Sequence, residues 1–347
     1  MAAVIDGCAG GAYYRAFFSV AVECSVTADA LYALIADDMR AVDVVIRRRL
    51  HSDVALVRQV AEYIVAGGGK RMRPALVLIA AKAMDYRGSD HHELAAVVEF
   101  IHTATLLHDD VVDESDLRRG RETANALFGN AASVLVGDFL YSRAFQMMVA
   151  VGSMRIMEVL ADATNTIAEG EVLQLMNCHN ADIGVEEYLQ VIRFKTAKLF
   201  EAAGRLGAII GGASPPIEAG LASYGMHLGT AFQLIDDVLD YSGEEVETGK
   251  HLGDDLAEGK PTLPLIHVMK RGSAEQASCV RHAIEEGGRD QFAQVLAAVR
   301  ASGALDTARA YAEAESATAI AALDGLPASI YKDALIQLSS FAVARRY

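Results

Sequence analysis

The sequence predicts an all-α protein, and three observations carry this prediction. Apolar residues recur at helical spacing along nearly the whole chain. Only 6 of the 347 residues are proline, so few positions would interrupt a helix. No sustained alternation of apolar and polar residues, the pattern of a half-buried strand, is found in the sequence. The apolar fraction of 52% is ample for a large core.

Helices are expected between clusters of glycine, proline and polar residues. The breaks are "AGGGKRMRP", "YRGSD", "RRGRETAN", "GGASPP" and the long polar segment "SGEEVETGKHLGDDLAEGKPTLP". The predicted helices cover 28–49, 53–65, 72–84, 91–114, 131–150, 154–178, 185–212, 215–242 and several shorter stretches up to 345. No linker separates two differently composed halves, so we expect one domain over 28–347, preceded by a flexible extension over 1–27.

Charge and cysteine content exclude several classes of protein. A formal net charge of -15 argues against a nucleic-acid partner, which would need a basic surface. The four cysteines, Cys8, Cys24, Cys178 and Cys279, show no metal-ligand spacing, which fits a reducing, cytoplasmic environment. We find no apolar stretch of the roughly 18 residues that span a bilayer, so no integral membrane association is expected. The apolar part of "YYRAFFSVAVECSV" is short and no basic region precedes it, so a secretory signal is not expected.

One acidic motif occurs twice, each time at the end of a strongly apolar helix. The copies are Asp109, Asp110 and Asp113 in "LLHDDVVDE", and Asp236, Asp237 and Asp240 in "LIDDVLDYS". The first and third aspartates of a copy share one helix face, where unpaired like charges repel, so a cation is expected between them. Magnesium prefers oxygen ligands and often completes its shell with substrate phosphate. A solvated helix end could explain one copy, but two copies indicate a clamped diphosphate.

Basic residues cluster beside the predicted breaks, where phosphate ligands are expected. They are Lys70, Arg71, Arg73, Arg118, Arg119, Lys195, Lys198, Lys250 and Lys260. Taken singly, each is more simply a solvated surface charge, and only the set around two acidic motifs is informative. The segment "GGGKRMRP" is not a Walker A loop, because Ile64 and Arg71 stand where that motif needs glycine and Ser or Thr.

Six segments together resemble one known family. They are "GGGKRMRP", "EFIHTATLLHDDVVDESDLRRG", "IAEGEVLQL", "FKTAKLF", "GTAFQLIDDVLDYSG" and "GDDLAEGKPTLPLI". From about residue 36 to its end, the chain resembles the trans-polyprenyl diphosphate synthases, and within them the bacterial long-chain, octaprenyl type. The resemblance implies an isoprenoid-synthase helical bundle around a central cavity, and a homodimer.

The resemblance also implies roles for individual residues. Three Mg²⁺ ions on the allylic diphosphate would be held by Asp109, Asp110, Asp113, Asp236, Asp237 and Asp240. The allylic diphosphate site would be completed by Arg118, Lys195, Thr196, Gln233, Lys250 and Lys260. Isopentenyl diphosphate would be held by Lys70, Arg73, His102 and Arg119. By its residues alone, His102 reads more simply as a core histidine. Glu171 stands where short-chain relatives commonly have glutamine.

The implied reaction ionises an allylic diphosphate, lets the isopentenyl double bond attack the cation, and removes one proton. Farnesyl diphosphate would be extended to octaprenyl diphosphate, C40, for a respiratory quinone, with nonaprenyl and decaprenyl products as alternatives. A class I terpene cyclase shares the first motif but needs no isopentenyl site, which Lys70, Arg73 and His102 indicate. A non-catalytic regulatory subunit would be expected to lack some of the six aspartates, and all are present.

The growing product needs an apolar tunnel between helices. Thr105 lies four residues before Asp109 on the same helix face, and Ala104 lies beside it, where short-chain relatives place aromatic plugs. A helix of about 20 residues spans roughly 30 Å, comparable with an extended C40 chain. Phe145, Met147 and Met148 could form the tunnel floor, although core packing is expected for at least two of them.

Overall fold

The computed structural model describes residues 28–242, 252–287 and 289–345. Within these ranges the chain is almost entirely helical, which confirms the predicted all-α class. The strands described are β1 (Leu117–Arg118) and β2 (Arg121–Glu122), which form a two-residue antiparallel hairpin directly after the first acidic motif. The predicted extension over 1–27 and the predicted ligand Lys250 lie outside the described residues.

The N-terminal half follows the predicted helices closely. Its helices are α1 (Ala28–Leu34), α2 (Ala36–Arg49), α3 (Ala55–Ala66), α4 (Met72–Ala83), α5 (Asp90–Val112), α6 (Ala124–Phe128), α7 (Asn130–Val151) and α8 (Met154–Asn177). The helix expected over 28–49 is interrupted at Ile35, whose backbone leaves helical values at φ -116° and ψ 17°. Ile35 is fully buried, so the turn places an apolar side chain in the core.

The C-terminal half contains more and shorter elements. They are α9 (Val185–Ile192), the π-helical turn η1 (Arg193–Ala197), α10 (Lys198–Ile210), α11 (Pro215–Ser242), α13 (Asp254–Ala257), α14 (Leu263–Arg271), α15 (Ala274–Glu286), α16 (Phe292–Ala301), α17 (Ala304–Ala321) and α18 (Ile330–Ala344). The helix predicted over 185–212 is therefore not one uniform α-helix, because η1 interrupts it. A π turn adds a residue to one turn and often occurs at functional sites.

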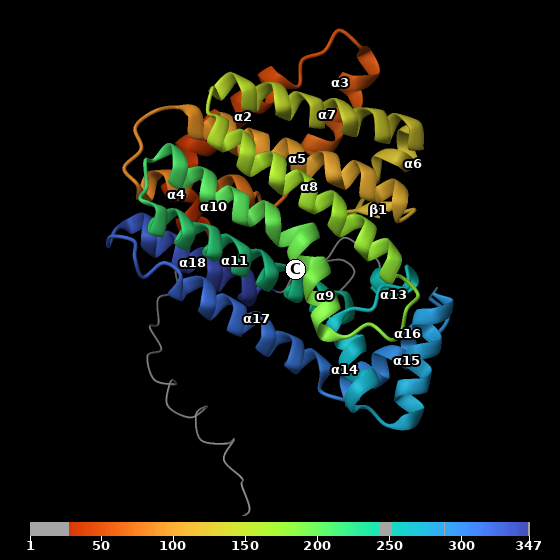
Figure 1. Ribbon diagram of the computed structural model, residues 1–347. Coiled ribbons are helices and arrows are strands. Elements are labelled where there is room, and N and C mark those ends of the chain that lie inside the picture. Colours follow the sequence, from red (N-terminus) through yellow and green to blue (C-terminus); the bar gives the residue numbers. More distant parts are fainter. Residues whose placement is uncertain (1–27, 243–251, 288, 346–347) are drawn as a thin grey trace, which may run out of the picture.

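Long helices lie side by side around the main core, as Figure 1 shows. Helix α5 packs between α7 and α4, while α10 packs against α4 and α11, and α11 packs against α17. Helix α4 is buried along most of its length, since Pro74 to Ala81 are all buried. At the lower right of Figure 1, α13 to α16 form a smaller group with its own apolar cluster, which includes Leu265, Val280 and Val295.

Helix α7 corrects one expectation drawn from the sequence. Among the described residues, α7 alone is long and apolar enough to cross a membrane by length and composition, although no stretch of that length was expected. It contains two charged residues, Asp138 and Arg143, and its mean hydropathy stays high in spite of them. In the fold it packs against α5, so part of its apolar surface belongs to the bundle. Val134, Leu135 and Val149 remain exposed.

A polar cluster ties the first helices to α5. Asp38 Oδ1 of α2 accepts hydrogen bonds from His91 Nε2 at 3.2 Å and His92 Nε2 at 2.9 Å, and Lys82 Nζ of α4 lies 3.2 Å from it. Burial lowers the pKa of His91 to about 4, so its imidazole is neutral. The cluster therefore joins three helices around one carboxylate.

Candidate active site

One face of α5 lines the main cavity of the protein, which has a volume of about 660 Å³. Glu99, His102, Leu106, Asp109 and Asp113 all line it. Their spacing of three or four residues is the spacing that keeps side chains on one side of an α-helix. The sequence of α5 therefore builds a wall that runs from the basic residues at one end to the first aspartate motif at the other.

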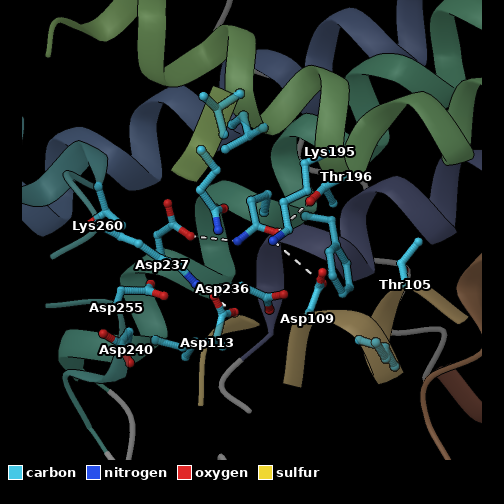
Figure 2. Close-up of a pocket in the computed structure, with 18 of the residues that line it drawn as sticks. Thr105, Asp109, Asp113, Lys195, Thr196, Asp236, Asp237, Asp240, Asp255 and Lys260 are labelled. Atoms are coloured by element: carbon cyan, nitrogen blue, oxygen red, sulfur yellow. Dashed lines mark hydrogen bonds and ion pairs between the residues drawn. The ribbon is translucent and has the colours of Figure 1, made fainter. Parts of the chain in front are cut away.

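The opposite walls come from α11 and η1. Helix α11 contributes Gln233, Asp236, Asp237 and Asp240, and η1 contributes Lys195 and Thr196. In Figure 2 Lys195 and Thr196 approach from the side opposite Asp109, while Asp236 and Asp237 lie between them and Lys260, and Asp240 lies beside Asp255. The structure thus brings both aspartate motifs to one cavity.

In the first motif, the outer aspartates face lysines across the cavity. Lys195 Nζ lies 3.6 Å from Asp109 Oδ2, and Lys260 Nζ donates to Asp113 Oδ2 at 3.0 Å. Burial alone would lower the pKa of Lys260, but Asp113 and Glu258 outweigh it and raise that pKa. Both lysines therefore stay charged beside the carboxylates.

The middle aspartate of the first motif has a different environment. Asp110 is fully buried, and its Oδ1 accepts hydrogen bonds from Arg118 Nε at 2.8 Å and lies 2.6 Å from Arg118 Nη2. This geometry is a bidentate approach of a guanidinium to one carboxylate oxygen. Asp110 lines the small side cavity behind the motif and not the main cavity, so its predicted role as a metal ligand stays a prediction.

Glu171 of α8 joins the first motif because a glycine lets α8 approach η1 closely. A Cβ atom at Gly170 would lie 2.6 Å from Lys195 N and 2.9 Å from Phe194 Cβ. The close approach places Glu171 Oε2 at 2.7 Å from Lys195 Nζ. Burial and the charge of Asp109 raise the pKa of Glu171 to about 7, in spite of Lys195.

The second motif is held by neutral groups and by the C-terminal helix. Asp237 is buried and accepts hydrogen bonds from Tyr188 Oη at 2.5 Å and Gln233 Nε2 at 2.8 Å. Burial raises its pKa, and the nearby carboxylates of Asp255 and Asp236 raise it further. Asp236 Oδ1 lies 2.7 Å from Arg345 Nη1, just beyond the end of α18.

This acidic half of the cavity fits divalent cations. Carboxylate oxygens from α5, α8 and α11 converge there, and among the described residues they outnumber the ammonium groups of Lys195 and Lys260. Mutual repulsion contributes to the raised pKa values of Glu171 and Asp237. Hard oxygen donors in excess of local cations are the donor set that Mg²⁺ and Ca²⁺ prefer. The number of ions that this half binds stays a prediction.

The other half of the cavity is basic. It is lined by all four residues that were predicted to hold isopentenyl diphosphate: Lys70, Arg73, His102 and Arg119. Burial and the charges of Arg345 and Arg119 together lower the pKa of Lys70 to about 8, although Asp236 opposes them. Burial and the neighbouring guanidiniums lower the pKa of His102 well below its usual range, so this imidazole is neutral. A pocket with this excess of buried positive charge fits an anion.

Three of the five non-glycine residues with positive φ in the described part of the chain lie at or next to the cavity. Arg71 (φ 47°), Glu114 (φ 50°) and Arg119 (φ 54°) adopt left-handed conformations that are uncommon outside glycine. Arg71 and Arg119 line the cavity, and Glu114 follows Asp113 directly. Such strain persists where the surrounding structure fixes it, and it is often found at functional sites.

The predicted tunnel residues occupy different environments. Thr105 lines the main cavity. Ala104, Met147 and Met148 are fully buried in the core, and Phe145 packs against that core; none of these four lines the main cavity. The role of Ala104 and Phe145 in product length therefore stays a prediction.

Several cavity residues were not assigned to the site from the sequence. Arg345 reaches Asp236 from a distant part of the chain, and no local motif indicates that contact. Tyr188 and Asp255 line the cavity beside Asp237. Glu99 could have been found, because it precedes His102 by three residues on the helix face that carries Asp109.

An all-helical bundle with two facing aspartate clusters and a basic pocket on one cavity defines an isoprenoid synthase. The family model for polyprenyl synthetase matches residues 54–300. The chain is 56% identical over 313 residues to octaprenyl diphosphate synthase of Escherichia coli (strain K12), covering 90% of this chain and 97% of that protein. It is 47% identical over 316 residues to the all-trans-nonaprenyl-diphosphate synthase (geranyl-diphosphate specific) of Rhodobacter capsulatus, covering 91% of this chain and 97% of that protein.

A solved structure agrees with this class. The crystal structure of polyprenyl synthase from Caulobacter crescentus CB15, complexed with calcium and isoprenyl diphosphate, has a TM-score of 0.90 and 45% sequence identity. It covers 92% of this chain and 98% of that one. The chain belongs to the polyprenyl synthetase family, and it is a prenyltransferase.

Proposed function

We propose that this enzyme adds isopentenyl diphosphate repeatedly to farnesyl diphosphate and releases octaprenyl diphosphate. The observation that carries the proposal is that one cavity is lined both by the two aspartate motifs and by a group of basic residues, which supports two separate diphosphate sites. The higher identity to the octaprenyl relative, 56% against 47% for the nonaprenyl relative, supports the C40 product.

The allylic diphosphate binds in the acidic half. The two aspartate motifs would hold three Mg²⁺ ions, which would supply the positive charge that neutralises the diphosphate as the carbon–oxygen bond breaks. Lys195 and Lys260 hold positive charge beside Asp109 and Asp113, where the departing diphosphate accumulates negative charge. Thr196 donates to Gln233 Oε1 at 3.1 Å, which fixes both side chains at the same wall. Lys250 completes the site as a further proposed ligand.

Arg118 has two proposed roles at this site. It fixes the buried Asp110 behind the motif, and it lines the cavity as a ligand of the allylic diphosphate. The carboxylates of Asp110, Asp109 and Asp113 outweigh the effect of burial and raise its pKa. Arg118 therefore stays charged at any pH at which the protein is folded.

Isopentenyl diphosphate binds in the basic half, on Lys70, Arg73, His102 and Arg119. The Arg73 guanidinium lies 4.3 Å from the ring centroid of Phe200, which orients it toward the cavity. The neutral His102 offers a hydrogen bond without adding charge. The isopentenyl double bond is the nucleophile, and the departing diphosphate takes the proton released after each addition, so neither a side-chain nucleophile nor a side-chain base is needed.

We further propose a cytoplasmic homodimer that supplies the side chain of a respiratory quinone. Exposed apolar residues support an interface: Val134 and Leu135 in α7, and Val172, Leu175 and Met176 in α8, are 37% to 73% exposed. Exposed apolar patches of this kind often mark protein interfaces. Sedimentation of the purified protein tests the dimer.

Product sizing tests the function. The pure protein is incubated with farnesyl diphosphate, isopentenyl diphosphate and Mg²⁺, and the products are separated by chain length. A C40 product supports the proposal, and C45 or C50 indicates the nonaprenyl or decaprenyl alternative. Absence of any condensation by a folded dimer would indicate a regulatory subunit. Removal of Mg²⁺ with a chelator should abolish turnover, because the acidic half depends on added cations.

A further inference from the structure

Glu99 is an acidic residue placed among the cations of the basic half. It lies on the cavity face of α5, one turn before His102, and its side chain is only 16% exposed. Arg71 Nε lies 3.8 Å from Glu99 Oε1. Burial raises the pKa of Glu99, while the charges of Arg71, Arg73 and Arg119 lower it. Three guanidiniums therefore attract this one carboxylate.

The guanidiniums need such an anchor when no substrate is bound. Burial lowers the pKa of Arg73 to about 10, and its Nε has no hydrogen-bond partner within the described residues. Burial lowers the pKa of Arg119, and the charges of Arg118 and Arg71 lower it further. Both arginines gain attraction from Glu99. Without an anion among them, these like charges would repel and the side chains would spread.

The backbone around the guanidiniums leaves little room for other arrangements. The Arg119 guanidinium packs against Gly69, where a Cβ atom would lie 2.8 Å from its Nη1. Arg71 is held from the other side by Asp43, whose Oδ1 accepts from Arg71 Nη1 at 2.6 Å. Gly69 and Asp43 therefore limit where Arg119 and Arg71 can lie, and Glu99 supplies the negative charge that offsets the repulsion among the guanidiniums.

We propose that Glu99 is a positioning residue that holds Arg71, Arg73 and Arg119 in the arrangement that receives isopentenyl diphosphate. The inference rests on the function proposed above and adds a residue to it. Ordering the guanidiniums in advance spares the substrate the entropic cost of fixing them. Glu99 itself lines the cavity, but the three guanidiniums around it carry more positive charge than it carries negative charge, so its repulsion of the diphosphate is offset.

The test compares Glu99→Gln with a matched control on the same helix. Glu93 also pairs with two arginines, since its Oε2 accepts from Arg49 Nε at 3.2 Å and its Oε1 pairs with Arg48, but it does not line the cavity. Calorimetry with isopentenyl diphosphate in magnesium-free buffer measures binding directly, because the proposed ligands are side chains. We expect Glu99→Gln to weaken this binding about tenfold, while Glu93→Gln and the parent bind equally.

Steady-state kinetics then separates positioning from folding. In Glu99→Gln the KM for isopentenyl diphosphate should rise about tenfold, with the KM for farnesyl diphosphate unchanged within about twofold. Glu99→Asp, which keeps the charge, should recover part of the loss. Unchanged or tighter isopentenyl diphosphate binding in folded Glu99→Gln, or equal losses for both substrates, would overturn the inference. A parent protein that binds neither diphosphate would instead overturn the proposed function.

Discussion

The two halves of the cavity have opposite effects on the pKa values of the cationic side chains that line them. In the acidic half, Lys195 and Lys260 lie beside carboxylates that raise their pKa values. In the basic half, burial lowers the pKa of Lys70 and Arg73, and further cations lower that of Lys70 more. Each half is therefore short of one kind of charge, which the proposed metal ions in the acidic half and the proposed isopentenyl diphosphate in the basic half would supply. The difference explains how one cavity can distinguish two substrates that carry the same diphosphate group.

Loss of Asp109 should produce the largest effect, because it removes a proposed metal ligand from the acidic half. Asp109→Ala should lower kcat by about a thousandfold, or about 4 kcal/mol of barrier, since the metal supplies the main charge stabilisation. Single-turnover kinetics over a magnesium titration measures this loss, and circular dichroism checks that the fold survives. Near-normal turnover with an unchanged magnesium requirement would contradict the assignment of this motif.

The middle aspartates of the two motifs should respond differently to the same substitution. Asp110→Asn leaves Arg118 without its charged partner and should cost about 3 kcal/mol of unfolding free energy. Asp237→Asn should change stability by less than about 1 kcal/mol, because the partners of Asp237 are neutral and burial already disfavours its charged form. Urea denaturation of both variants measures the difference. Equal losses would show that the two motifs are held in the same way.

The pH dependence of isopentenyl diphosphate use should report the basic half. Lys70 has a pKa of about 8 in the folded protein, so it carries its charge below this pH and loses it above. We expect kcat/KM for isopentenyl diphosphate to fall about tenfold per pH unit above pH 8. The Lys70→Arg variant should move this decline to higher pH. A decline at the same pH in Lys70→Arg would assign the titration to another group.

The smallest effect on rate should come with a change in product length. Thr105 lines the cavity one turn before Asp109, so Thr105→Phe should shorten the product to about C15 or C20 while turnover stays within about tenfold. Ala104→Phe is the companion variant, since Ala104 is also a predicted tunnel residue but is fully buried outside the cavity, where an added ring should cost about 1 to 3 kcal/mol of stability. If Ala104→Phe shortens the product and Thr105→Phe does not, the prenyl product grows along the other side of α5.

The sequence predicted the helical class and most helix positions because apolar periodicity is a local property. Thr105, Asp109 and Asp113 could likewise be placed on one face of a helix from their spacing alone. The contact between Asp236 and Arg345 could not be predicted, because it depends on the path of the chain from α11 to the end of α18. From spacing alone, Asp110 and Asp109 were equally good candidates for metal ligands. Only the fold shows that Arg118 holds Asp110 behind the cavity wall.

The π turn at Arg193–Ala197 has a consequence for any attempt to transplant this site. One additional residue in that turn shifts the angular phase of α10 relative to α9 by about 100°, the rotation of one residue in an α-helix. Lys195 and Thr196 both lie within this π turn, and both line the cavity. If the segment were rebuilt as an ideal α-helix, at least one of these two side chains would point away from the cavity. Deleting one residue from η1 should therefore preserve helicity and remove the site.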